Sequence, residues 1–220
     1  MRLMREIRFF LSDQNEPTAT TNNWSGTGAS SLGQYLTLRA VVEGEADPES
    51  GYLCNIKVVE SLLKDRILST LTVEAAAQPF LAGTCLNREL ESATIDCENP
   101  VRLVELELAY SPYVSVTTSK DVPGMIQLTQ SFEFSAAHRL FRPNLSDDEN
   151  AKLFGKCANP HGHGHNYVVD VTVTHDKEDA SDHTPRLDIP TFDRIVDELV
   201  IDRFDHKHLN IDCAEFSTLN

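Results

Sequence analysis

Residues 163–175 read HGHNYVVDVTVTH, and this stretch decides how the fold is interpreted. Asp170 and Thr172 continue the alternation that begins at the histidines, which is the period-two pattern of a β-strand. Side chains two residues apart on a strand point to the same side. His163 and His165 should therefore project together from one face.

The N-terminal half of the chain repeats this layout. Residues 33–44, GQYLTLRAVVEG, align with the strand so that Tyr35 falls on Tyr167. Residues 54–67, CNIKVVESLLKDRI, align with residues 187–200, LDIPTFDRIVDELV. The identity is weak but the element order is shared, which is typical of tandem repeats. The alternative is that two α+β units merely have a common layout.

We expect the first repeat over residues 1–122 and the second over residues 123–220, in an α+β fold. The expected elements are strands near 4–12, 34–43, 126–140 and 163–175, a loop at 18–31, helices at 55–68, from Thr72 and from Asp188, and a strand pair or bent strand around Ser111–Pro112. Pro79 should lie in the first turns of the second helix or kink it. The second repeat stops at Asn220, so we expect it to be C-terminally incomplete, truncated before its second helix.

Two helix starts carry clear signals. Asn55 is a favourable N-cap for the first helix. After Asp188, Pro190 suits a first helical turn. One face of this last helix then carries Phe192, Ile195, Val196 and Leu199.

Composition excludes several classes of partner. The chain has 220 residues and a formal net charge of -15, which argues against nucleic acid or an anionic membrane, since both favour a basic surface. An anionic small substrate stays possible, because a metal or a basic pocket can dominate locally. The five cysteines match no disulfide framework, no signal peptide is evident, and no apolar run reaches the roughly 18 residues of a membrane span. We therefore expect a cytoplasmic protein with reduced thiols.

The histidine pair is a candidate metal site. His138, in FSAAHRL at residues 134–140, lies on the expected neighbouring strand and could join His163 and His165 as a third ligand. Three neutral imidazoles with an open fourth position are typical of catalytic zinc, although iron or nickel could also bind. The alternative is a purely structural pair, which is weakened by His138 and by the nearby Cys157.

Three motifs together resemble those of the 6-pyruvoyl-tetrahydropterin synthase and 6-carboxy-tetrahydropterin synthase family. They are FSAAHRL at 134–140, KLFGKCANPHGHGHNY at 152–167 and FDHKHLN at 204–210. The resemblance covers about residues 126–212 and implies the T-fold, an antiparallel sheet with helices on one face, here as a tandem pair. It also implies a homo-oligomeric ring with active sites at subunit junctions.

The resemblance implies a role for each matching residue. Zn²⁺ would be bound by His138, His163 and His165. Cys157 would be the base that removes a proton, and Asp205 and His206 would act with it in proton relay.

Other positions depart from the family pattern. A glutamate on a late strand anchors the pterin ring in this family, and the chain ends before reaching it. The first repeat has Tyr110 where that glutamate would fall, and Ser31 and Gly33 where the histidine pair would be. We expect no zinc site in that repeat.

The implied activity is a lyase that converts 7,8-dihydroneopterin triphosphate with loss of triphosphate, in tetrahydrobiopterin or queuosine biosynthesis. Pyruvoyl-type members resemble C-x5-H-G-H-N-Y and carboxy-type members C-x3-H-G-H. Cys157 fits the first spacing with His163 and the second with His161, while Asn166 and Tyr167 favour the first. The product therefore stays open. Two alternatives also remain: a metal-free T-fold pterin enzyme such as an aldolase, and a non-catalytic pterin-binding subunit.

For several other residues a structural or solvated position is either the alternative or the expectation. Asp205 and His206 alone could form a helix C-terminal turn, where a histidine favours the helix dipole. Three histidines in polar surroundings should be solvated: His175, His183 and His208. Four cysteines should pack rather than react: Cys54, Cys85, Cys97 and Cys213.

Overall fold

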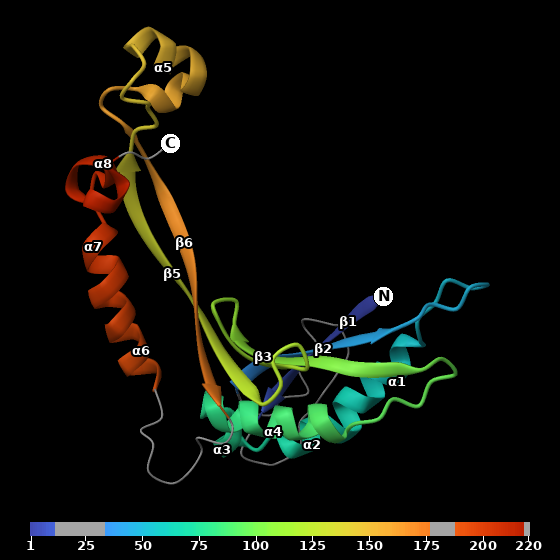
Figure 1. The fold of residues 1–220 in the computed structure, drawn as a ribbon. Coiled ribbons are helices and arrows are strands. Elements are labelled where there is room, and N and C mark those ends of the chain that lie inside the picture. The colour runs from blue at the N-terminus through green and yellow to red at the C-terminus, as the bar shows by residue number, and fades with distance from the viewer. Residues whose placement is uncertain (12–33, 177–187, 218–220) are drawn as a thin grey trace. The chain divides into compact units, whose positions relative to one another are not determined.

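The computed structural model describes residues 1–11, 34–176 and 188–217 (Figure 1). The chain separates into two compact units. Unit 1 holds residues 1–130 and 171–184, and unit 2 holds residues 131–170 and 185–220. This division follows contacts in space and does not coincide with the repeat boundary at residue 122, which stays a prediction.

An antiparallel sheet forms the centre of unit 1. Its strands are β1 (Arg2–Leu11), β2 (Gln34–Gly44), β3 (Val101–Ser111) and β4 (Val114–Ser119), continued by the first part of β5 (Met125–His138). Ile7 pairs with Leu38, and Leu38 pairs with Leu108, so one row of buried aliphatic side chains crosses three strands. β3 and β4 pair with each other, which confirms a strand pair around Ser111–Pro112 rather than one bent strand.

Helices of unit 1 lie between β2 and β3 in the sequence. They are α1 (Ile56–Ser61), the π-helical turn η1 (Leu62–Ile67), α2 (Leu68–Thr70), α3 (Val73–Ala76) and α4 (Pro79–Ser92). Asn55 caps α1 by accepting a hydrogen bond from the Lys57 amide, as expected. Pro79 occupies the first turn of α4, where its missing N–H costs nothing, so it begins a new helix instead of kinking one.

Helix α4 approaches the sheet closely at Gly83. A Cβ placed on Gly83 would lie 2.3 Å from Ile126 Cγ2 and 3.1 Å from Val116 Cγ2. A side chain there would have to displace two core residues of β4 and β5. The glycine thus sets the distance between helix and sheet.

Unit 2 is built on the second part of β5 and the first part of β6 (His163–Asp176). Its helices are α5 (Asp147–Phe154), the 3₁₀ turn η2 (Gly155–Ala158), α6 (Ile189–Val196), the π-helical turn η4 (Asp197–Ile201), α7 (Asp202–Phe204), α8 (Leu209–Asp212) and the 3₁₀ turn η5 (Ala214–Phe216). The core contains Phe134, Leu209 and Cys213, and the ring of Phe134 stacks on Tyr167 with centroids 5.1 Å apart.

The apolar face expected for α6 is only partly correct. Asp188 caps the helix through the Thr191 amide, and Phe192 and Val196 are buried. Leu199, by contrast, is 59% exposed. The π-helical turn widens the helix at this point, which changes the side of the helix on which the following residues lie. Val200 packs against the core in this turn instead.

The six strands of the described chain hydrogen-bond in sequence order, β1 to β6, in one sheet. The antiparallel sheet with helices confirms the α+β class, while the tandem-repeat interpretation stays a prediction. Within the described ranges, no helix is long and apolar enough to cross a membrane. The loop at 18–31 and the positions Ser31 and Gly33 lie outside the described residues.

Candidate metal and catalytic site

Three histidine side chains converge where two neighbouring strands of unit 2 meet. His138 ends β5, and His163 and His165 begin β6. The Nε2 atom of His138 lies 3.1 Å from that of His163 and 3.2 Å from that of His165. One ligand atom from each ring falls within 4.8 Å of the others, a group that could hold a metal ion.

These distances fit a zinc ion. Zn–N bonds of about 2.0–2.1 Å at tetrahedral angles place neighbouring nitrogens about 3.3 Å apart. The two measured Nε2 separations are close to that value. The three nitrogens therefore need little movement to share one cation.

Outer contacts orient two of the three rings. The Nδ1 atom of His138 lies 3.4 Å from the Tyr167 hydroxyl, and that of His165 lies 3.1 Å from the Asn166 carbonyl oxygen. When Nδ1 of His165 carries the hydrogen and donates it to that carbonyl, Nε2 keeps its lone pair for a metal. The Nδ1 atom of His163 is buried and has no hydrogen-bond partner among the described residues.

The environment of His138 favours its neutral form. Burial lowers the pKa of His138 most, and the neighbouring His163, His165 and His208 rings lower it further. A neutral imidazole is the form that binds a metal. The electrostatics of the cluster therefore agree with its geometry.

A second group of residues attaches to β5 beside the histidines. The Asp205 carboxylate accepts a hydrogen bond from the Ser135 amide at 2.9 Å, and the His206 amide donates to the Ser135 carbonyl at 2.7 Å. The Ala137 amide donates to the Lys207 carbonyl at 2.9 Å. These hydrogen bonds hold the Asp205–His206 pair against the strand that carries His138.

The Asp205–His206 pair has a defined orientation. The other carboxylate oxygen of Asp205 lies 2.6 Å from His206 Nδ1. His206 has a φ of 54°, a left-handed conformation that is rare outside glycine and is frequent at functional sites. Hydrogen bonds from the Ser135 amide and then from His206 lower the pKa of Asp205. A charged Asp205 holds the proton of His206 on Nδ1 and leaves Nε2 facing solvent.

An open cavity of about 660 Å³ is shared by His206 and one histidine of the cluster. Its lining includes His165, Asn166, His206 and His208. One proposed metal ligand and one proposed relay residue thus face the same space.

Cys157 lies apart from this cavity. It lies in η2, and its carbonyl accepts a hydrogen bond from the Leu140 amide at 2.9 Å, two residues beyond His138. Its side chain is partly exposed and makes no hydrogen bond within the part of unit 2 that is described. It does not line the cavity that holds His165 and His206. The backbone of Cys157 is therefore anchored near the cluster, while its role as base stays a prediction.

His208 is a site residue that sequence reasoning missed. It was expected to be solvated, but its Nδ1 atom is buried without a hydrogen-bond partner in the described chain, and the ring lines the cavity. Gly162, with a φ of +72°, lies beneath it: an added Cβ would be 2.6 Å from His208 Nε2 and 3.0 Å from the His138 carbonyl oxygen. The motif FDHKHLN held the signal, since a histidine three residues after Asp205 continues along the segment that joins β5.

The remaining candidate histidines and Cys213 lie in different environments. His161 is exposed, and its amide donates to the Asn159 side chain at 3.0 Å. The ring of His175 lies 5.2 Å from that of Phe80 rather than in open solvent. Cys213 packs in the core as expected. His183 lies outside the described residues.

One family of known proteins matches the second half of the chain. Residues 127–220 match the family model described as 6-pyruvoyl tetrahydropterin synthase. The 6-pyruvoyl tetrahydrobiopterin synthases of Pongo abelii and Homo sapiens are each 42% identical over 91 residues, which is 41% of this chain and 61% of each relative. That of Drosophila melanogaster is 42% identical over 90 residues, which is 41% of this chain and 52% of the relative.

A solved structure of Caenorhabditis elegans 6-pyruvoyl tetrahydropterin synthase has 36% sequence identity and a TM-score of 0.37, covering 43% of this chain and 66% of that one. The chain spans less than two thirds of the length of these curated relatives. The names of these relatives agree with that of the matching family. Residues 127–220 of this chain therefore match the 6-pyruvoyl tetrahydropterin synthase family.

Proposed function

We propose that this chain is a zinc-dependent lyase of the 6-pyruvoyl/6-carboxy-tetrahydropterin synthase type, acting on 7,8-dihydroneopterin triphosphate with loss of triphosphate. The observation that carries the proposal is the convergence of three Nε2 atoms within the segment that matches this family. The T-fold and a ring of identical subunits belong to the same proposal.

His138, His163 and His165 would hold the zinc ion. Bound there, Zn²⁺ would act as a Lewis acid that polarises substrate oxygens and stabilises the negative charge left by proton removal. Burial and the neighbouring histidines lower the pKa of His138, which favours the neutral imidazole that a metal binds.

Proton movement would fall to the chain's own side chains. Asp205 fixes the tautomer of His206, so His206 Nε2 can take up or release a proton in the cavity. Cys157 would accept a proton at Sγ, which requires its thiolate form. Since its thiol does not line the cavity with His206, we propose that the two residues meet across a subunit junction of the ring.

The ligand register favours the pyruvoyl type. The three converging rings use His163 and His165 and leave His161 exposed. This choice gives Cys157 the C-x5-H-G-H spacing rather than C-x3-H-G-H. The product is therefore proposed to be the 6-pyruvoyl compound.

One assay tests the proposal. Zinc-loaded protein is mixed with 7,8-dihydroneopterin triphosphate, and released triphosphate and product mass are measured. Zinc-dependent release supports a lyase, and the product mass separates pyruvoyl from carboxy chemistry. Binding of the pterin without release contradicts the lyase and supports a non-catalytic pterin-binding subunit. Conversion by metal-free protein contradicts zinc dependence and supports chemistry of the aldolase kind.

A further inference from the structure

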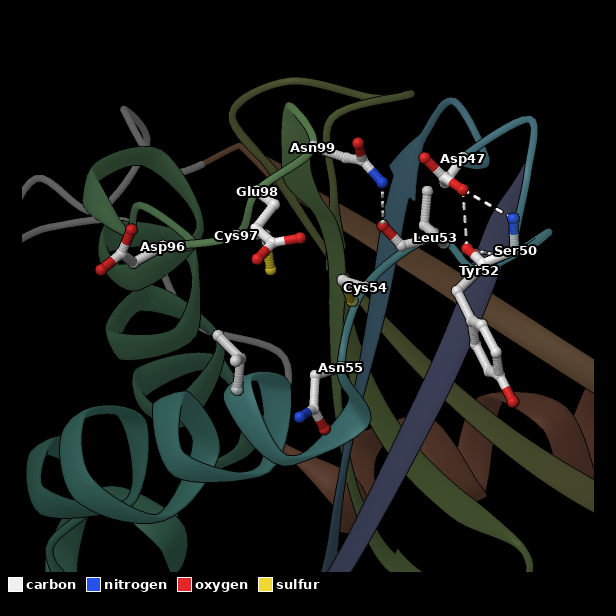
Figure 2. A pocket seen from close by; sticks show the side chains of 11 residues that line it. Asp47, Ser50, Tyr52, Leu53, Cys54, Asn55, Asp96, Cys97, Glu98 and Asn99 are labelled. Carbon is white, nitrogen blue, oxygen red and sulfur yellow. Dashed lines mark hydrogen bonds between the residues drawn. The ribbon is translucent and has the colours of Figure 1, made fainter.

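Two cysteines distant in the sequence meet in unit 1. Cys54 directly precedes the N-cap of α1, and Cys97 lies in the segment between α4 and β3. Both line one pocket of about 510 Å³. Figure 2 shows the two thiols in the same space, between the start of α1 and the segment that carries Asp96 and Glu98.

The two side chains lie close enough to interact with each other. Burial first, and then the neighbouring Cys97, raise the pKa of Cys54 to about 11. A second link holds the two segments together, since the Asn99 side-chain amide donates to the Leu53 carbonyl at 3.4 Å (Figure 2).

The other three cysteines do not share this setting. Cys85 lies in α4, Cys157 in η2, and Cys213 in the core of unit 2, and none of them lines this pocket. All five are free thiols in the structure. The Cys54–Cys97 pair is therefore a dithiol that the fold has already brought together.

We propose that Cys54 and Cys97 are a reversible modification site, which takes a low-molecular-weight disulfide as oxidant and forms an intrachain disulfide. The Cys97 thiolate attacks one sulfur of the oxidant, forms a mixed disulfide and displaces one small thiolate. Cys54 then loses its proton and attacks the Cys97 sulfur, which displaces the second small thiolate. The protein loses two hydrogens in total, and one small disulfide is reduced to two thiols.

The disulfide would close a loop of the chain that contains the helices of unit 1. Every described helix of unit 1, from α1 to α4, lies between Cys54 and Cys97 in the sequence. Cross-linking the ends of such a loop restricts the unfolded chain more than the folded one, in which both cysteines already line one pocket. Oxidation should therefore stabilise unit 1 without moving its helices.

Peptide mapping of the wild-type protein is the first test. Reduced protein is incubated with glutathione disulfide and digested with trypsin without reduction. We expect a cross-linked pair of residues 40–57 and 89–102, two hydrogens lighter than the separate peptides, while Cys85 stays in its own peptide at 67–88. The titratable thiols should fall by two, and dithiothreitol should restore them. Full retention of the thiols, or pairing of Cys54 with another cysteine, would overturn the proposal.

Variants give the second test. Cys54→Ser and Cys97→Ser should each abolish the loss of two thiols, whereas the matched control Cys85→Ser should not. Oxidation should raise the thermal midpoint of wild type and of Cys85→Ser by roughly 5 °C, and should leave it unchanged in the other two. An equal rise in Cys54→Ser would contradict the assignment. If a serine variant fails to fold, the peptide map of the wild type still decides.

Discussion

The Nε2 atoms of His138 and His163 lie 3.1 Å apart, and His165 Nε2 lies 3.2 Å from the first of them. A neutral imidazole carries one ring hydrogen, so three rings that meet at these atoms cannot satisfy every lone pair by hydrogen bonds alone. A single cation at the centre satisfies all three.

Replacing His163 with alanine should remove zinc. The variant loses one of three nitrogen ligands, and we expect zinc affinity to fall by more than about 100-fold, since outer contacts alone contribute 10–100-fold. His161→Ala is the matched control, because His161 is an exposed histidine two residues away and should leave affinity unchanged. Metal content after dialysis and titration calorimetry measure both. Zinc loss in His161→Ala together with retention in His165→Ala would move the ligand pair to the other register.

Gly162→Ala should disturb the site through packing and backbone strain together. Its φ is +72°, and the new Cβ would lie 2.6 Å from His208 Nε2 and 3.0 Å from the His138 carbonyl oxygen. We expect a loss of stability on the order of 1–3 kcal/mol and weaker zinc binding.

Gly155→Ala provides the comparison for that variant. Gly155 also has a positive φ, +57°, but a Cβ there meets nothing within 4 Å. It should lose stability through strain alone and keep zinc affinity. Equal zinc affinity in the two alanine variants, measured by calorimetry, would show that His208 and the His138 backbone do not support the cluster.

Much of the fold and of the cluster could be predicted from residue patterns. The i, i+2 spacing of His163 and His165 on a strand, with His138 on the next strand, placed three rings on one face, and their Nε2 atoms do converge. The N-caps Asn55 and Asp188 began their helices as expected. These features depend on residues that are close together in the sequence, so strand spacing and capping preferences are enough to predict them.

Features that depend on tertiary packing could not be predicted from the sequence. The π-helical turn after α6 exposes Leu199, although strict helical spacing puts it on the apolar face. His208 becomes part of the cavity only because residues 205–208 attach to β5. Cys54 and Cys97 line one pocket although no spacing rule connects their segments. Each of these follows from tertiary contacts rather than from periodicity.

Cys157→Ala should keep zinc and lose turnover. Its thiol makes no hydrogen bond to the histidine cluster among the described residues, so its removal leaves the three ligands intact. Loss of a general base lowers the rate by about 10²–10⁴-fold. Triphosphate release and bound zinc are measured on the same sample, with Cys85→Ala as the control for removal of a thiol elsewhere. Unchanged turnover in Cys157→Ala would assign the base to another residue.

The capping box of α5 should make that helix sensitive to acid. Hydrogen bonds from the Ser146 hydroxyl and then from its amide lower the pKa of Glu149 in the folded state. A lowered folded pKa stabilises the protein above the unfolded pKa of about 4.3, and this contribution is lost as pH falls through the folded pKa. The protection factor of the α5 amides, which compares their exchange with that of an unstructured chain at the same pH, should therefore be constant from pH 7 to about pH 5 and fall below it. Glu149→Gln should abolish that fall, and an identical pH profile of protection in the variant would contradict the role of the carboxylate.

Asp205→Asn should separate the positioning of His206 from metal binding. Asp205 accepts hydrogen bonds from the Ser135 amide and from His206 Nδ1. An asparagine can still accept from Ser135 but presents an amide donor to the ring, which favours the tautomer with hydrogen on Nε2. We expect turnover to fall by about 100-fold or more with zinc content unchanged. Asp212→Asn is the control, because Asp212 lies in the same cavity and accepts instead from the His208 amide. A loss of zinc in Asp205→Asn equal to that in His163→Ala would show that the carboxylate holds the metal site together rather than the proton relay.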